Sequence, residues 1–319
     1  MTAVAPPADF GSAELRAGTT RVVVVPALGG KIITLELGGR EWLWRSAGRN
    51  PKLPEDGASY AELGDIGGAD ECFPTVAPCL LPSNIARYGG LSLPDHGELW
   101  SQPSSFALET RPEGMYATCG WQGRRMPYRF VRGIFVGRAA QVEMQYAVTN
   151  DGRSPLPFLW SSRAVFPLAR ETRVVLPEGA RVRVWSQRGV ALGGPGAEMR
   201  WPRAVAGGKM LDLSVPEAVA RAYGSTLYVD GAGGRAAIEQ DGARLEVQLD
   251  GAAPPFFSIE VEKRAWTPFR RARDEHRVAL APSIGAPASL AEAIGGWRNA
   301  AWLEPGETRE WTVTWRAAS

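Results

Sequence analysis

Residues 141–150 read Gln-Val-Glu-Met-Gln-Tyr-Ala-Val-Thr-Asn, with an apolar side chain at every second position. Successive side chains of a β-strand point to opposite faces of the sheet, so this alternation predicts a strand with one buried face. The same alternation occurs at 181–185, 244–250 and 310–315, and a further strand is predicted at 257–261. Short strands of this kind predict a β-sandwich or a β-barrel.

Turn-forming residues separate the predicted strands, as in the Asn-Asp-Gly at 150–152. Helix signals are few. Ser289 and Glu292 have the spacing of a capping box at the start of a short helix over 289–294, and a second short stretch lies at 217–222. The sequence shows no long units that alternate helices with strands, which disfavours Rossmann-like and TIM-barrel folds. We therefore expect an all-β protein with less than about a fifth of its residues in helices.

Composition disfavours several classes of function. The formal net charge is +2 and 22% of the residues are charged, so we expect no nucleic-acid partner and no membrane partner. The three cysteines follow no disulfide framework and the first twenty residues lack a signal-peptide pattern, so the expected location is cytoplasmic. With His96 and His276 as the only histidines, we expect no metal site, and no cofactor motif is found. No linker divides the chain, which predicts a single domain over 1–319.

Four separated segments of the sequence form a pattern. Each segment alone is a weak signal, but their order and spacing together are specific. They are 25–32 with 39–44, 67–78, 93–100, and 282–290 with 303–308 and Trp311. The second contains Gly-Gly-Ala-Asp-Glu-Cys-Phe-Pro and the third contains Pro-Asp-His-Gly. In this order and spacing they resemble the aldose 1-epimerase, or galactose mutarotase-like, superfamily. The resemblance implies a large antiparallel β-sandwich, the galactose mutarotase-like supersandwich, with a few short helices and a groove that binds a monosaccharide.

The resemblance also implies an acid–base mechanism. In this family a glutamate takes the proton from the anomeric hydroxyl while a histidine protonates the ring oxygen, and the ring opens and closes as the other anomer. His96 matches the family's His-Gly motif and is the predicted catalytic acid. Without the resemblance, a structural histidine bonded to the backbone would be the favoured interpretation.

Two family positions carry different residues here. Arg163 stands where the family has a second histidine; it can bind sugar hydroxyls, hold an anionic substituent, or simply lie at the surface. Ala281 stands in an Ala-Pro dipeptide that matches the family's Glu-Pro, so the usual base is missing. Among carboxylates from elsewhere, we assign the catalytic role to Glu260. The other candidates lie in two of the motifs and on one predicted strand: Asp70, Glu71, Asp95, Glu98 and Glu262.

Sugars stack their apolar faces on aromatic rings, so tryptophans near the motifs are candidates to line the groove, although large rings are more often part of the core. The candidates include Trp266, and Trp311 and Trp315 are expected in the core. The predicted substrate-binding residues are Arg163, Asp70, Asp95, Trp100 and Trp160.

Three functions remain open from the sequence. The first is an epimerase-like sugar enzyme with altered chemistry or an altered substrate, such as a sugar acid. The second is a non-catalytic carbohydrate-binding protein, which the missing glutamate favours. The third is a domain that serves only partner or subunit contacts. A small-molecule carbohydrate is the expected partner in the first two. All three functions stay open because the fold alone does not fix the function.

Overall fold

The computed structural model describes residues 10–45, 53–63, 67–220, 222–230, 232–265 and 276–318. Strands form 54% of the structure and helices 5%, which confirms the predicted all-β class and the low helix content. Among the described residues, no helix combines the length and the apolar character needed to cross a membrane.

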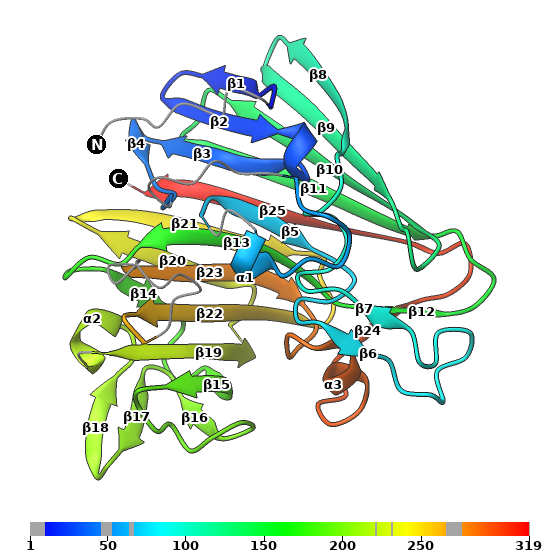
Figure 1. Cartoon of the computed structure of the whole chain (residues 1–319). Helices are drawn as coiled ribbons and strands as arrows, with labels where there is room; N and C mark the ends of the chain where they lie inside the picture. The colour runs from blue at the N-terminus through cyan, green and yellow to red at the C-terminus, as the bar shows by residue number, and fades with distance from the viewer. Residues whose placement is uncertain are drawn as a thin grey trace.

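The larger of the two main sheets has thirteen strands in the described part of the chain. They are β1 (Ala13–Ala17), β2 (Thr20–Val25), β3 (Lys31–Leu37), β4 (Arg40–Glu41), β5 (Ala69–Cys72), β13 (Trp160–Pro167), β15 (Arg181–Arg188), β16 (Glu198–Arg200), β17 (Arg203–Ala206), β18 (Lys209–Asp212), β19 (Tyr223–Asp230), β22 (Pro255–Lys263) and β23 (His276–Ile284). The strand order is β1-β2-β3-β5-β13-β23-β22-β19-β15-β16-β17-β18, with β4 paired to β3 (Figure 1). Neighbouring strands are antiparallel throughout.

The second main sheet has eight described strands. They are β8 (Ser105–Arg111), β9 (Gly114–Gln122), β10 (Tyr128–Gly137), β11 (Gln141–Asn150), β14 (Arg173–Val175), β20 (Arg235–Gln240), β21 (Ala243–Asp250) and β25 (Thr308–Ala318). Their order is β14-β20-β21-β25-β11-β10-β9-β8. Two small pairs complete the set: β6 (Cys79–Leu80) with β7 (Ser92–Leu93), and β12 (Leu156–Phe158) with β24 (Ala301–Leu303).

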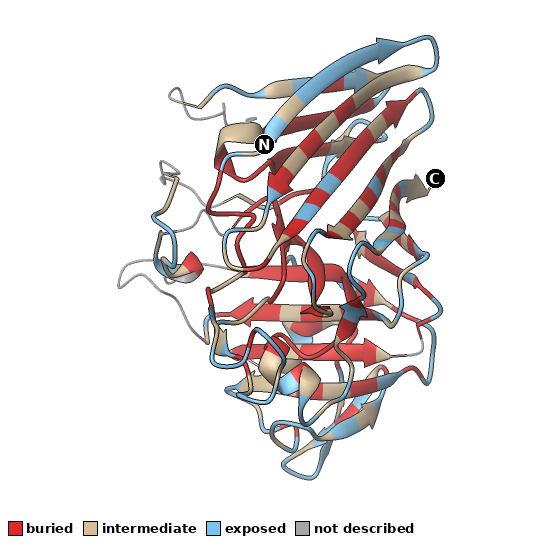
Figure 2. Ribbon diagram, turned by 90° about the vertical axis from the view of Figure 1, so that its right-hand side faces the viewer, coloured by how far each residue is buried: buried red, intermediate tan, exposed pale blue. Residues whose placement is uncertain are grey.

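The core lies between the two main sheets. Along β11, which coincides with the predicted strand, the even-numbered residues 142–148 are buried, and Figure 2 shows buried and more exposed residues alternating along the strands. Rings from both sheets meet in this core: Tyr146 and Trp311 stack with centroids 5.4 Å apart, and Trp160 of the larger sheet lies 4.9 Å from Trp311. The alternating apolar pattern therefore becomes one face of a sandwich, as predicted.

The helices are short. They are η1 (Pro26–Leu28, a 3-10 turn), α1 (Tyr60–Leu63), α2 (Pro216–Val219) and α3 (Leu290–Ile294). The Ser289 hydroxyl accepts a hydrogen bond from the Glu292 amide at the start of α3, as the capping-box spacing predicts. No sequence signal predicted α1.

Candidate functional site

The candidate site lies on the face of the larger sheet that points away from the eight-stranded sheet. β5 and β13 pair with Asp70 opposite Arg163 and with Glu71 opposite Ser162. Neighbouring side chains of a strand point to opposite faces, so Asp70 and Arg163 share one face. Glu71 meets Arg132 of the eight-stranded sheet, which makes its face the inner one. The outer face therefore carries the predicted binding residues Asp70 and Arg163.

Trp160 belongs to the inner face and not to the site. Its indole N–H donates to Glu71 at 2.8 Å, and its side chain is fully buried. Glu71 also accepts hydrogen bonds from Arg132 (3.0 Å), the Tyr146 hydroxyl (3.0 Å) and the Ser162 hydroxyl (3.2 Å). This placement corrects the prediction that Trp160 lines the groove. It also removes Glu71 from the candidate bases, because its oxygens are enclosed within the core.

Glu260 of β22 lies on the outer face in a clamp of two arginines. Arg163 Nε and Nη2 donate to its two oxygens at 2.9 and 3.0 Å, and Arg277 Nη1 of β23 donates at 3.2 Å. Burial alone would raise the pKa of Glu260, but the charges of Arg163 and Arg277, with a contribution from His96, hold it well below its usual range. The Glu260 side chain keeps 32% of its surface exposed.

The clamp changes the roles predicted for these residues. A carboxylate with so low a pKa stays ionised, so Glu260 is better suited to accept hydrogen bonds than to take a proton as a base. Arg163 faces Glu260 with two donors of its planar fork, in the geometry with which arginine binds a carboxylate. Glu260 thus occupies the place at Arg163 that the carboxylate of a sugar acid would take.

His96 is held on a tight turn by the backbone and by Asp95. Its amide donates to the Val76 carbonyl at 2.7 Å, and its φ of 58° lies in the left-handed region. Gly97 follows with φ 71°, and a Cβ there would lie 2.1 Å from the Phe73 carbonyl oxygen, so only glycine fits. The turn therefore fixes the direction of the imidazole.

Asp95 orients the imidazole of His96. Its Oδ1 lies 2.8 Å from His96 Nδ1. Burial would raise the pKa of Asp95, but the hydrogen bond and the charge of His96 lower it below its ordinary value, so the carboxylate is ionised and only accepts. The proton in this contact therefore sits on Nδ1, which leaves Nε2 of His96 for a ligand.

Tyr60 of α1 contacts five of the seven residues predicted for the site. Its ring stacks on His96 with centroids 3.9 Å apart and meets the edge of Trp100 at 5.0 Å, and Arg163 Cζ lies 5.7 Å from the ring centre. Its hydroxyl donates to Asp70 at 2.6 Å and its amide to the Asp95 carboxylate at 3.0 Å. The sequence reasoning missed this residue. Its segment carries no motif, and its partners come from three other parts of the chain.

Asp70 and Trp100 are placed at the site but are enclosed. Asp70 contacts Lys31 Nζ at 2.5 Å in addition to Tyr60, and its side chain is 5% exposed. The Trp100 indole donates to the Asp95 carbonyl at 2.8 Å and is likewise buried. In this structure Trp100 supports the turn and the Tyr60 ring, and a sugar could reach Asp70 only if Tyr60 moved.

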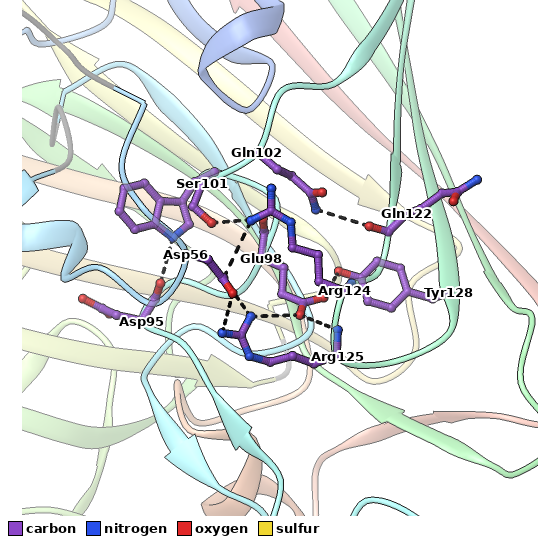
Figure 3. Close-up of polar contacts among 10 residues, drawn as sticks. Asp56, Asp95, Glu98, Ser101, Gln102, Gln122, Arg124, Arg125 and Tyr128 are labelled. Atoms are coloured by element: carbon purple, nitrogen blue, oxygen red, sulfur yellow. Dashed lines mark hydrogen bonds and ion pairs between the residues drawn. The ribbon is translucent and has the colours of Figure 1, made fainter.

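Glu98, another candidate base, fixes the loop that follows His96 (Figure 3). Its carboxylate is fully buried and accepts hydrogen bonds from the Arg124 and Arg125 amides, from Arg125 Nη1 and from the Tyr128 hydroxyl, at 2.8–3.2 Å. Arg125 also pairs with both oxygens of Asp56 at 2.8 and 2.9 Å. The loop between β9 and β10 thus joins the His96 turn to the segment that carries Tyr60.

Two other positions named from the sequence lie on β22 and β23. Ala281 is buried in β23 opposite Ser258, and Glu262 accepts from the Ala265 amide at 2.9 Å. Trp266 lies outside the described residues. Within the described ranges, no group of three histidine, cysteine or acidic side chains is placed to hold a metal ion.

Comparison with solved structures identifies the architecture, although no protein-family model and no curated protein matches the sequence. The Slr1438 protein from Synechocystis sp. PCC 6803 superposes with a TM-score of 0.70 at 16% identity, over 100% of this chain and 99% of that one. A galactose mutarotase-like protein from Lactobacillus casei ATCC 334 gives 0.61 at 13% identity, over 97% and 100%. A galactose mutarotase related enzyme from Lactobacillus acidophilus gives 0.62 at 14%, over 97% and 98%.

The chain has the galactose mutarotase-like fold. The resemblance predicted from the four sequence segments is thereby confirmed for the architecture. Identities of 13–16% carry the fold and not the activity, so the function of this chain has to be argued from its own outer face.

Proposed function

We propose that the protein binds a carbohydrate at the outer-face site through Glu260 and the Asp95–His96 pair. The observation that carries the proposal is the clamp of Arg163 and Arg277, which holds Glu260 ionised and fixed while part of its surface stays exposed. Sugar hydroxyls can donate to such a carboxylate, and a hydrogen bond to a charged group contributes about 1.5–3 kcal/mol. The same ionisation disfavours proton uptake, which supports binding over catalysis.

The proposed ligand is a neutral sugar. Arg163 and Arg277 already have a carboxylate partner, and an acidic sugar beside Glu260 would bring two negative charges together. The mutarotase-like solved structures support a carbohydrate as the class of ligand. A calorimetric panel of neutral sugars and sugar acids tests this choice, and tighter binding of the acids would contradict it.

A substitution at Glu260 tests the site itself. Glu260→Gln keeps the size of the side chain and removes its charge, so affinity for a neutral sugar should fall about 10- to 100-fold. Glu239→Gln is the matched control, because Glu239 is similarly exposed and pairs with Arg244 at 2.6 Å on the other sheet. Equal affinities of the two variants and the native protein would remove Glu260 from the binding site.

A slow mutarotase activity is the second candidate function, and the Asp95–His96 pair favours it. His96 can exchange a proton at Nε2, but Glu260 is held ionised by two arginines and Asp70 already accepts hydrogen bonds from Lys31 and Tyr60. A positioned acid or base typically raises the reaction rate about 10²- to 10⁴-fold. Turnover of glucose or galactose should therefore be slower by about this factor than in an enzyme that has both the acid and the base. Polarimetry of a fresh α-anomer measures this rate. Efficient turnover that His96→Ala abolishes would establish an enzyme instead.

A further inference from the structure

Tyr60 occupies the centre of the proposed site. Its ring stacks on His96, Arg163 Cζ lies 5.7 Å from the ring centre, and its hydroxyl donates to Asp70. The residue is only 2% exposed. These partners are three of the five predicted site residues that contact Tyr60.

A sugar ring makes contacts of the same kinds. Its apolar face stacks on an aromatic group, and its hydroxyls donate to carboxylates. We propose that Tyr60 is a gate: in the ligand-free protein its side chain fills the ligand position beside His96, Arg163 and Asp70, and it moves out when a sugar binds. This inference rests on the proposed function and concerns how the ligand enters that same site.

Exchange at Asp70 explains why the gate opens for a sugar. Asp70 is buried beside Lys31, and its Oδ2 accepts hydrogen bonds from both Lys31 and Tyr60. Withdrawal of Tyr60 alone would leave a buried acceptor with one partner fewer, which is unfavourable. A sugar hydroxyl restores the lost hydrogen bond, so opening of the gate is coupled to the arrival of a ligand with hydroxyl groups.

Arg125 links the segment that carries Tyr60 to the loop between β9 and β10. Asp56 lies four residues before Tyr60 and is bound by both terminal nitrogens of Arg125, whose Nη1 also reaches Glu98 at 3.2 Å (Figure 3). Glu98 is completely buried, whereas Asp56 is 43% exposed. Exposed ion pairs are weakened by salt. The Arg125–Asp56 ion pair, and not the Arg125–Glu98 contact, is therefore expected to break when Tyr60 moves.

The first test needs no ligand. His96 and His276 are the only histidines, so two imidazole Cε1–H signals are expected in a proton–carbon spectrum, and His276→Gln assigns them. The Tyr60 ring at 3.9 Å shifts the His96 signal through its ring current. Raising the salt from about 0.05 to about 1 M should move this signal toward its position in Tyr60→Leu. The His276 signal should not follow.

The second test measures sugar affinity and predicts its sign. If the closed form holds about 70–90% of the molecules, Tyr60→Leu should bind a neutral sugar about 3- to 10-fold more tightly. Asp56→Asn should show a gain in the same direction. Asp151→Asn is the matched control, because Asp151 forms an exposed two-bond pair with Arg129 on the same hairpin and should change nothing. Melting temperatures of all variants verify folding.

The outcomes separate a gate from a fixed wall of the site. Weaker binding by folded Tyr60→Leu, with a His96 signal that salt does not move, would overturn the gate and make Tyr60 part of the binding surface. If no variant and no native sample binds any sugar of the panel, the proposed function fails. The response of the His96 signal to salt and to Asp56→Asn then decides the gate independently.

Discussion

Glu71 and Glu260 lie on opposite faces of the larger sheet; Glu71 pairs with Arg132 of the eight-stranded sheet, and Glu260 with Arg163 and Arg277 of its own sheet. Both clusters bring a carboxylate against arginine at about 3 Å. The first is sealed between the two sheets, with both side chains 1% exposed. The second keeps Glu260 one-third exposed on the outer face. Similar chemistry therefore occurs in two environments that differ in access.

Access decides what each cluster can do. Protein donors surround Glu71, from Arg132, Tyr146, Trp160 and Ser162, so no ligand can reach it and the pair can serve only the fold. Glu260 has protein donors on one side and open surface on the other. A one-residue step along β13, from Ser162 to Arg163, separates the two roles, because neighbouring side chains point to opposite faces.

The largest effect is expected at the sealed pair. Arg132→Met leaves Glu71 as a buried charge without its ion partner, and breaking a buried pair typically costs about 3–5 kcal/mol. Chemical denaturation should report a loss of this size. Arg129→Met, at an exposed pair on the same strand, is the control and should change the free energy of unfolding by less than about 1 kcal/mol. A loss at Arg132 no larger than the control would show that the inner pair does not hold the sheets together.

A smaller and different effect is expected at the outer cluster. Arg163→Met frees Glu260 to rotate about its remaining partner Arg277, so affinity for a neutral sugar should fall about 10-fold or more. An acidic sugar should lose no more than a neutral one, since Arg163 is already paired. Calorimetry of both ligand classes checks this. A selective loss of the acidic ligand would restore the prediction that Arg163 recognises an anionic substituent.

The strands were the part of this molecule most open to prediction. The alternation at 141–150 coincides with β11, and the strands predicted at 181–185, 244–250 and 310–315 lie within β15, β21 and β25. Alternation reports burial of one face, which is a local property of the chain. The capped helix at 289–294 was likewise readable, because a capping box spans only four residues.

The site was only partly open to prediction. The resemblance pointed to His96 and Arg163. Glu260 and Glu262 are two residues apart on a strand and so share a face, but the sequence does not say which face of the sheet that is. Tyr60 and the Arg125–Asp56 contact depend on loops that meet only in the folded chain. Trp160 was misplaced because a motif gives a position in the sequence, whereas register decides which face the side chain takes.

The smallest effect is expected at the Asp95–His96 pair, whose contribution to the free energy of unfolding should depend on pH in a known direction. The pKa of Asp95 is lowered in the folded protein from an ordinary 3.8, so its ionised form stabilises the fold above that pH. This contribution is lost as the pH falls through the folded-state pKa. A partly exposed pair contributes about 0–1 kcal/mol. The difference in unfolding free energy between native protein and Asp95→Asn should therefore hold between about pH 5 and about pH 4 and shrink below. Denaturation series at closely spaced pH values measure it. A difference that grows as the pH falls below about 4 would mean that Asp95 is held protonated, and Nδ1 of His96 would then be the acceptor.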